Sequence, residues 1–247
     1  MKKTLLSLLF LPVLWVTFSG CGKDDDSQEA QLPKDFILTL SMEHVYGMAA
    51  LPFNLNQWFV HPRTNDSMLI HNIKYHLSHL FLIKQNGDTL FLQNAPLLFD
   101  VERPETLQVP FPAIPRGTYT GIGFAVGINE TDLQEYIEVL PHDMRWTNPN
   151  HHFAIHLTGH SPLAPPDDFL FNFELGGPQV FFPKFWDLTA NPIELNNNRT
   201  LIFNVNAARF WHGSTSISEL ADITEPSEQA TQMAQDFADG FIVKEIN

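Results

Sequence analysis

The sequence predicts an all-β protein, an antiparallel β-sandwich or barrel-like domain with long loops and a short C-terminal helix. Short segments in which apolar and polar residues alternate recur along the chain, and turn-forming residues separate them. The 247 residues include 21 Phe and 18 Pro but few helix-favouring stretches. Many short strands joined by loops are typical of sandwiches and barrels.

Eight segments have the composition expected of strands. They are residues 36–42, 68–83, 89–93, 106–111, 118–128, 153–157, 169–175 and 200–206, and we expect the final one to be the last strand. Residues 85–88 (Gln-Asn-Gly-Asp) form a strong turn signal between the second and third of them. Two helices are expected, a short one over 131–138 and another over 226–239, which has Pro at its start and Gly240 at its end.

The N-terminus has the pattern of a bacterial export signal. A positive start (Met-Lys-Lys) precedes residues 4–18, which are almost wholly apolar and too short for the roughly 20 residues of a spanning helix. Residues 19–21 (Ser-Gly-Cys) resemble a lipobox, in which the cysteine thiol receives the lipid. We therefore expect residues 1–20 to be cleaved and Cys21 to anchor the chain to a membrane. The alternative is an ordinary buried or free cysteine.

An acidic stretch follows the cysteine, and residues 21–34 are expected to form a flexible tether. It resembles the signal that sends Bacteroidetes lipoproteins to the outside of the outer membrane, although a simple solvated linker would have the same composition. The expected location is the outer membrane, with the protein lipid-anchored at the cell surface.

Composition excludes several classes of protein. Loss of residues 1–20 removes two lysines and changes the formal charge from −14 to −16, which disfavours nucleic acid as a partner. Cys21 is the single cysteine, so the chain has no intrachain disulfide and no Cys-based metal site. No nucleophile elbow, phosphate loop or His-Glu-x-x-His pattern occurs, and we expect no enzyme activity.

Four segments in order resemble the MbnP-like family of copper-binding proteins. They are residues 73–87 (IKYHLSHLFLIKQNG), 114–129 (IPRGTYTGIGFAVGIN), 140–159 (LPHDMRWTNPNHHFAIHLTG) and 171–177 (FNFELGG). The resemblance implies a β-sandwich-like fold, a copper cofactor and a dihaem cytochrome peroxidase-like partner. Together with the N-terminal pattern, it suggests four regions. They are a signal peptide (1–20), a tether (21–34), an MbnP-like β-domain (35–212) and a C-terminal extension with a helix (213–247).

The chain departs from the family at the positions of the known copper ligands. Glu130 follows Asn129 where copper-binding members tend to have histidine, Glu174 replaces a later histidine, and the expected Trp-His pair near Tyr75 is absent. The known ligands therefore cannot be transferred one by one.

Candidate ligands must come from the eleven histidines of this chain, because imidazole suits copper. We select His76, His79, His156 and His44. Strand alternation places His76 and His79 on opposite faces. It places His152, His156 and His160 on one face, successive members about 13 Å apart. The alternative for each is a half-buried, edge or solvated histidine without metal.

The resulting functional hypothesis is a cell-envelope lipoprotein that binds copper for uptake or storage. The alternative is a surface interaction module that kept the fold without a metal site. Such a module would recognise a protein, for instance a surface receptor, or a glycan through aromatic loops containing Phe181, Phe182, Phe185, Trp186 and Trp211.

Overall fold

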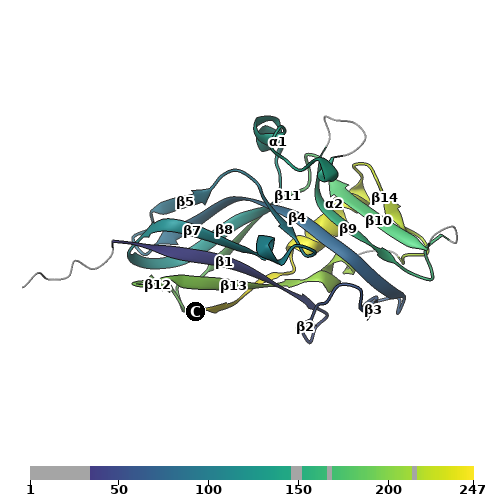
Figure 1. Ribbon diagram of the computed structural model, residues 1–247, viewed down its shortest axis with the longest axis horizontal. Helices are drawn as coiled ribbons and strands as arrows, with labels where there is room; N and C mark the ends of the chain where they lie inside the picture. The colour runs from purple at the N-terminus through teal and green to yellow at the C-terminus, as the bar shows by residue number, and fades with distance from the viewer. Residues whose placement is uncertain (1–33, 146–151, 166–168, 213–215) are drawn as a thin grey trace, which may run out of the picture. The chain divides into compact units, whose positions relative to one another are not determined.

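The computed structural model describes residues 34–145, 152–165, 169–212 and 216–247, which build two β-sheets (Figure 1). The first sheet has five strands. β15 (Phe241–Ile246), β13 (Arg199–Asn206), β1 (Asp35–Tyr46) and β2 (Leu51–Pro52) follow in that order, and β7 (Gln108–Pro115) also pairs with β1.

The second sheet has ten strands, and its main path runs β11-β8-β4-β9-β10-β14. β3, β5 and β6 pair with β4, and β12 pairs with β8. The bounds are β3 (Trp58–Val60), β4 (Ser67–Lys84), β5 (Thr89–Gln93), β6 (Leu97–Asp100), β8 (Gly117–Gly127), β9 (Phe153–His160), β10 (Leu170–Gly176), β11 (Phe181–Asp187), β12 (Ile193–Leu195) and β14 (Asp222–Ile223).

Both predicted helices are confirmed in the part of the chain that the structure describes. They are α1 (Glu130–Tyr136) and α2 (Glu228–Ala238), and the Ser227 hydroxyl caps α2 by accepting from the Ala230 amide. Short 3-10 helices also occur: η1 (Pro104–Leu107), η2 (His142–Met144) and η3 (Ala207–Trp211). None of the helices found within these ranges is long and apolar enough to cross a membrane.

The prediction of a purely antiparallel fold is wrong. β1 and β13 run parallel from Leu38↔Arg199 to Val45↔Asn206, and β10 pairs with β14 in the same sense. Alternating side chains appear in either strand orientation, so the pattern could not reveal the direction. The segment 200–206 is also not the last strand, because β14 and β15 follow it.

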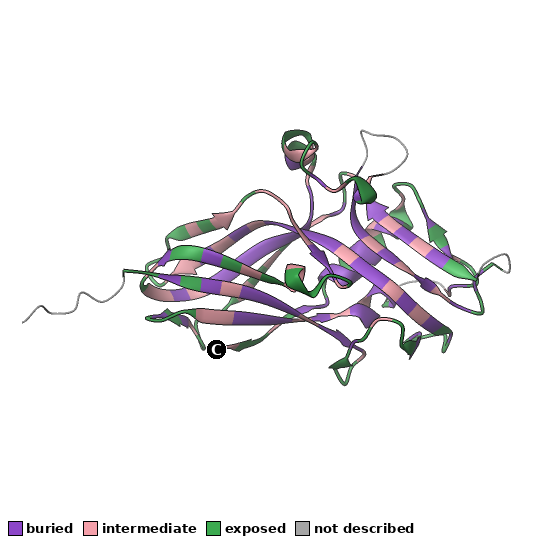
Figure 2. Cartoon of the chain, viewed as in Figure 1, coloured by how far each residue is buried: buried purple, intermediate pink, exposed green. Residues whose placement is uncertain are grey.

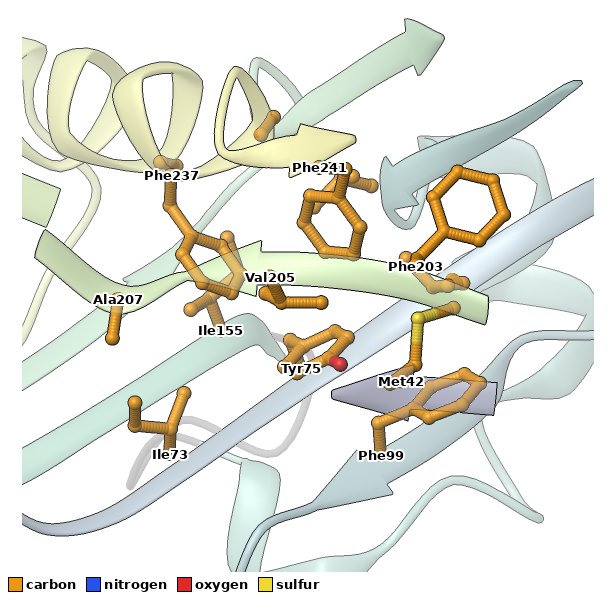
Figure 3. Close-up of a cluster of buried hydrophobic side chains, with 14 of the residues drawn as sticks. Met42, Ile73, Tyr75, Phe99, Ile155, Phe203, Val205, Ala207, Phe237 and Phe241 are labelled. Atoms are coloured by element: carbon orange, nitrogen blue, oxygen red, sulfur yellow. The ribbon is translucent and has the colours of Figure 1, made fainter. Parts of the chain in front are cut away.

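The hydrophobic core lies between the sheets. Phe124 of β8 contacts Phe203 of β13 with ring centroids 5.3 Å apart, and Tyr75 of β4 contacts Phe241 of β15 at 5.6 Å. Figure 3 shows Phe203, Val205 and Phe241 close to Tyr75 in this core. Buried residues follow the long strands of both sheets, whereas exposed residues gather in the loops and on α1 (Figure 2).

Strand β4 creates an irregular junction in the second sheet. Along residues 74–77, β6 occupies one edge of β4. The other edge pairs first with β9, as far as Tyr75, and then with β8, from Leu77 onward. His76 therefore lies where one neighbouring strand ends and another begins, and among the described strands it pairs only with Leu98 of β6.

Candidate metal site

His76 is fully buried at this junction. Its Nδ1 lies 3.3 Å from the carbonyl oxygen of Ala154, which can only accept a hydrogen bond. The Nδ1 therefore carries the hydrogen, and the Nε2 presents a lone pair. That Nε2 is buried and has no hydrogen-bond partner.

His152 lies beside His76, just before β9. The two ring centroids are 5.0 Å apart and the ring planes meet at 65°. His152 is 4% exposed, and neither of its ring nitrogens has a hydrogen-bond partner among the residues that the structure describes. A buried nitrogen without a partner costs about 1–3 kcal/mol, so three such atoms in two neighbouring rings call for an explanation.

Both imidazoles are neutral at physiological pH. Burial lowers the pKa of His76 to about 4 and that of His152 to about 3, and the positive charge of Arg145 further lowers the latter. A metal ion binds the neutral form of imidazole, so the two rings need no deprotonation before they can act as ligands.

A bulge in β9 brings His152 to this position. Leu175 of β10 pairs with Ile155, but the next residue, Gly176, pairs with Phe153, so Ala154 is an extra residue. As a result Phe153 and His156, which a regular strand would place on opposite faces, have ring centroids 5.0 Å apart. The regular alternation assumed from the sequence does not hold at this end of the strand.

Apolar side chains and an ion-pair network surround the two rings. Leu98, which is opposite His76 in register, packs with buried Met144 and Phe153. The Lys74 ammonium lies 2.6 Å from an Asp143 carboxylate oxygen and 3.6 Å from one of Asp100. The Lys74–Asp143 ion pair joins β4 to the short helix η2, which carries Met144.

A cavity of about 600 Å³ adjoins His152. Most of its lining is apolar and comes from α1, the following turn and the neighbouring loops. Its lining residues are Ile128, Glu130, Leu133, Gln134, Ile137, His152, Ala154, Gly177, Pro178 and Pro226.

The four histidines predicted as ligands have separate environments. The Nε2 of His44 forms a hydrogen bond with the Tyr75 hydroxyl in the main core (3.2 Å), and burial lowers the pKa of His44 to about 3. The Nε2 of His79 contacts the Asp132 carboxylate (2.6 Å). His156 donates from Nε2 to the side-chain oxygen of Asn172 (2.8 Å), and burial lowers its pKa.

These contacts leave His76 as the predicted ligand with an unpartnered buried nitrogen. In the described ranges, no group of three or more His, Cys, Asp or Glu side chains is arranged to hold a metal ion. The neighbour of His76, His152, was not among the selected ligands, because regular alternation placed it about 13 Å from the next histidine on its face and did not bring it near His76. The consecutive pair His151-His152 at the start of a strand was the available signal.

Other residues singled out in the sequence have varied positions. Cys21 and Trp146 lie outside the described residues. Trp211 is 1% exposed, so it cannot take part in surface recognition as the interaction hypothesis required. Phe185, by contrast, is 56% exposed.

Comparison with known proteins agrees with the two-sheet architecture. The model of the MbnP family matches residues 36–236. The chain belongs to the MbnP family. This MbnP-family chain is similar to the solved structure of MbnP from Methylosinus trichosporium, with a TM-score of 0.53 and 14% sequence identity over 75% of this chain and 80% of that one. No curated protein sequence matches the chain. The family is one associated with copper.

Proposed function

We propose that this MbnP-family protein binds one copper ion as Cu(I), with one ring nitrogen each from His76 and His152 as ligands. The observation that carries the proposal is the pair of buried, neutral imidazoles with unpartnered nitrogens and ring centroids 5.0 Å apart. The donor type suits copper, because imidazole is a good copper ligand.

The spacing of the rings fits a shared ion. A metal about 2 Å from an imidazole nitrogen lies about 3 Å from the ring centre, so a linear arrangement would place the centres about 6 Å apart. The observed 5.0 Å is compatible with a bent arrangement. The singly charged Cu(I) also suits a buried site with neutral ligands and the apolar cover of Leu98, Met144 and Phe153 better than a doubly charged ion.

The proposed role is copper uptake or storage at the cell envelope, without catalytic turnover. The support for this location is the N-terminal sequence pattern, in which an export signal precedes Cys21. A lipid on Cys21 would keep the protein on the outer membrane, and a dihaem cytochrome peroxidase-like protein is the partner that the family resemblance suggests.

The test is a Cu(I) titration of residues 34–247 under anaerobic conditions, in competition with a chromogenic chelator. We expect one copper per chain, and an affinity at least tenfold lower in His76→Gln and in His152→Gln. His160→Gln is the matched control, because this histidine is the last residue of β9, the strand that His152 immediately precedes. Equal affinities in all four proteins would exclude the His76–His152 site.

A second candidate function is recognition of a surface ligand by aromatic residues. Its support is a shallow apolar hollow of about 300 Å³ lined by Phe81, Phe181 and Phe185. If the folded protein retains no copper, this interaction role becomes the better explanation, and Phe185→Ala should then weaken adhesion of the protein to cell-surface glycans.

A further inference from the structure

The cavity beside His152 has the size and chemistry of a small-molecule site. Its volume of about 600 Å³ falls within the roughly 300–1,000 Å³ typical of ligand pockets. His152 forms part of its wall although the residue is 4% exposed, and both ring nitrogens lack partners. The apolar lining thus contains one buried imidazole whose nitrogens are available to a ligand or a metal ion.

We infer that this cavity admits a small uncharged molecule, with an apolar body and a soft nitrogen or sulfur donor, which binds copper held by His76 and His152. The inference rests on the proposed function. A bent arrangement, with which the 5.0 Å spacing is compatible, would leave a position for a third donor. Met144, Phe153 and Leu98 form an apolar cluster beside the pair, with Leu98 opposite His76 in register and Phe153 next to His152, whereas His152 also borders the cavity.

The lining defines the chemical class of the ligand. Ile128, Leu133, Ile137, Pro178 and Pro226 would contact an apolar body. Among the described residues that line the cavity, Glu130 is the single acidic one and none is Lys or Arg. No described basic side chain of the cavity would therefore pair with an anionic ligand, whereas a neutral imidazole or thioether needs no such partner.

The experiment uses 4-phenylimidazole, which combines an imidazole donor with an apolar ring. It is titrated calorimetrically into copper-free and Cu(I)-loaded protein, and the bound copper is counted after gel filtration both before and after the titration. We expect one molecule to bind per loaded chain, at least tenfold more tightly than to copper-free protein, with the copper retained.

Two variants locate the binding. Ile137→Phe enlarges a side chain that lines the cavity, and it should weaken 4-phenylimidazole binding at least tenfold without changing copper retention. Val139→Phe makes a comparable change at a position that is 77% exposed and outside the lining. This variant should bind 4-phenylimidazole as tightly as the unmodified protein does. If Ile137→Phe does not fold, Leu133→Phe fills the cavity from α1 instead.

The outcomes separate the inference from the proposed function. Failure to retain copper before any 4-phenylimidazole is added would overturn the copper site itself. Copper retention with equal binding to loaded and copper-free protein would overturn only the inference. The same holds if the cavity-filling variant binds normally, or if 4-phenylimidazole removes the copper.

Discussion

At the scale of single residues, hydrogen bonding distinguishes a structural histidine from a candidate ligand. His44, His76 and His152 are all buried, and burial lowers the pKa of each to about 3 or 4. The Nε2 of His44 forms a hydrogen bond with the Tyr75 hydroxyl, whereas the Nε2 of His76 and both nitrogens of His152 have no partner among the described residues. Depressed pKa values alone would not have separated the three.

This difference predicts opposite effects of leucine substitution on the copper-free protein. His44→Leu would leave the buried Tyr75 hydroxyl unpaired and should lower the free energy of unfolding by about 1–3 kcal/mol. His152→Leu removes two unpartnered nitrogens, so the free energy of unfolding should stay the same or rise while copper binding is lost. Urea unfolding of both variants provides the measurement. A clear loss of stability in His152→Leu would argue that its ring has a structural role.

The pKa of His44 also predicts acid sensitivity. Its value in the folded protein, about 3, is below the value of about 6.5 in an unfolded chain. Between these values the unfolded state binds more protons, so the free energy of unfolding falls as the pH is lowered from about 6.5. Between pH 7 and pH 5 the contribution of His44 amounts to about 2 kcal/mol. His44→Gln should flatten the pH dependence of urea unfolding, whereas His142→Gln, an exposed control, should leave it unchanged.

At the scale of elements, the close pairing of β9 and β10 positions His152. A Cβ atom on Gly176 would lie 2.5 Å from the Cα of Phe153 and 2.7 Å from the carbonyl oxygen of His152. Both contacts are with backbone atoms, so the strands would have to separate. Gly176→Ala should therefore cost about 1–3 kcal/mol of stability and weaken Cu(I) binding together. Gly117→Ala is the control, since its nearest neighbour is the Tyr119 ring at 3.9 Å. Unchanged copper affinity in Gly176→Ala would show that the β9–β10 spacing does not position the ligand.

Local sequence patterns predicted the elements that depend on local signals. The turn at 85–88, the alternating strands β4 and β8, and the capped helix α2 were all found. The segment of β11 was interpreted as aromatic loops, but it forms a strand at the edge of the sheet, where Pro183 is tolerated. The parallel β1–β13 pairing joins residues more than 150 positions apart and has no local signature.

The candidate site could be predicted even less well than the fold from local sequence patterns, because it depends on contacts between distant strands. His76 was selected from the sequence, but its neighbour His152 was not, because a regular strand was assumed and the bulge at Ala154 could not be foreseen. Only the three-dimensional arrangement shows that the junction of β8 and β9 leaves His76 beside His152. A bulge reverses the facing of every residue before it, so a single irregular position decided the outcome.

At the scale of the whole molecule, the proposed anchor and the proposed copper site occupy separate parts of the chain. Pro33–Asn247 forms one compact unit that contains His76 and His152, whereas Cys21 precedes it. Cys21→Ala should therefore leave the Cu(I) affinity within a factor of about two, because Cys21 is not one of the proposed ligands and precedes the unit that contains them.

The same substitution should move the protein out of the membrane. Acyl chains on Cys21 supply the membrane affinity of a lipoprotein. Cleavage after residue 20 would remove the apolar run at residues 4–18, so the acyl chains would be the expected anchor. Expressed with its signal in a Gram-negative host, the unmodified chain should sediment with the outer membrane and incorporate labelled palmitate. Cys21→Ala should do neither and should retain copper in whichever fraction it occupies. Persistent outer-membrane association of the unlabelled variant would show that contacts of the folded domain, rather than a lipid, hold the protein at the envelope.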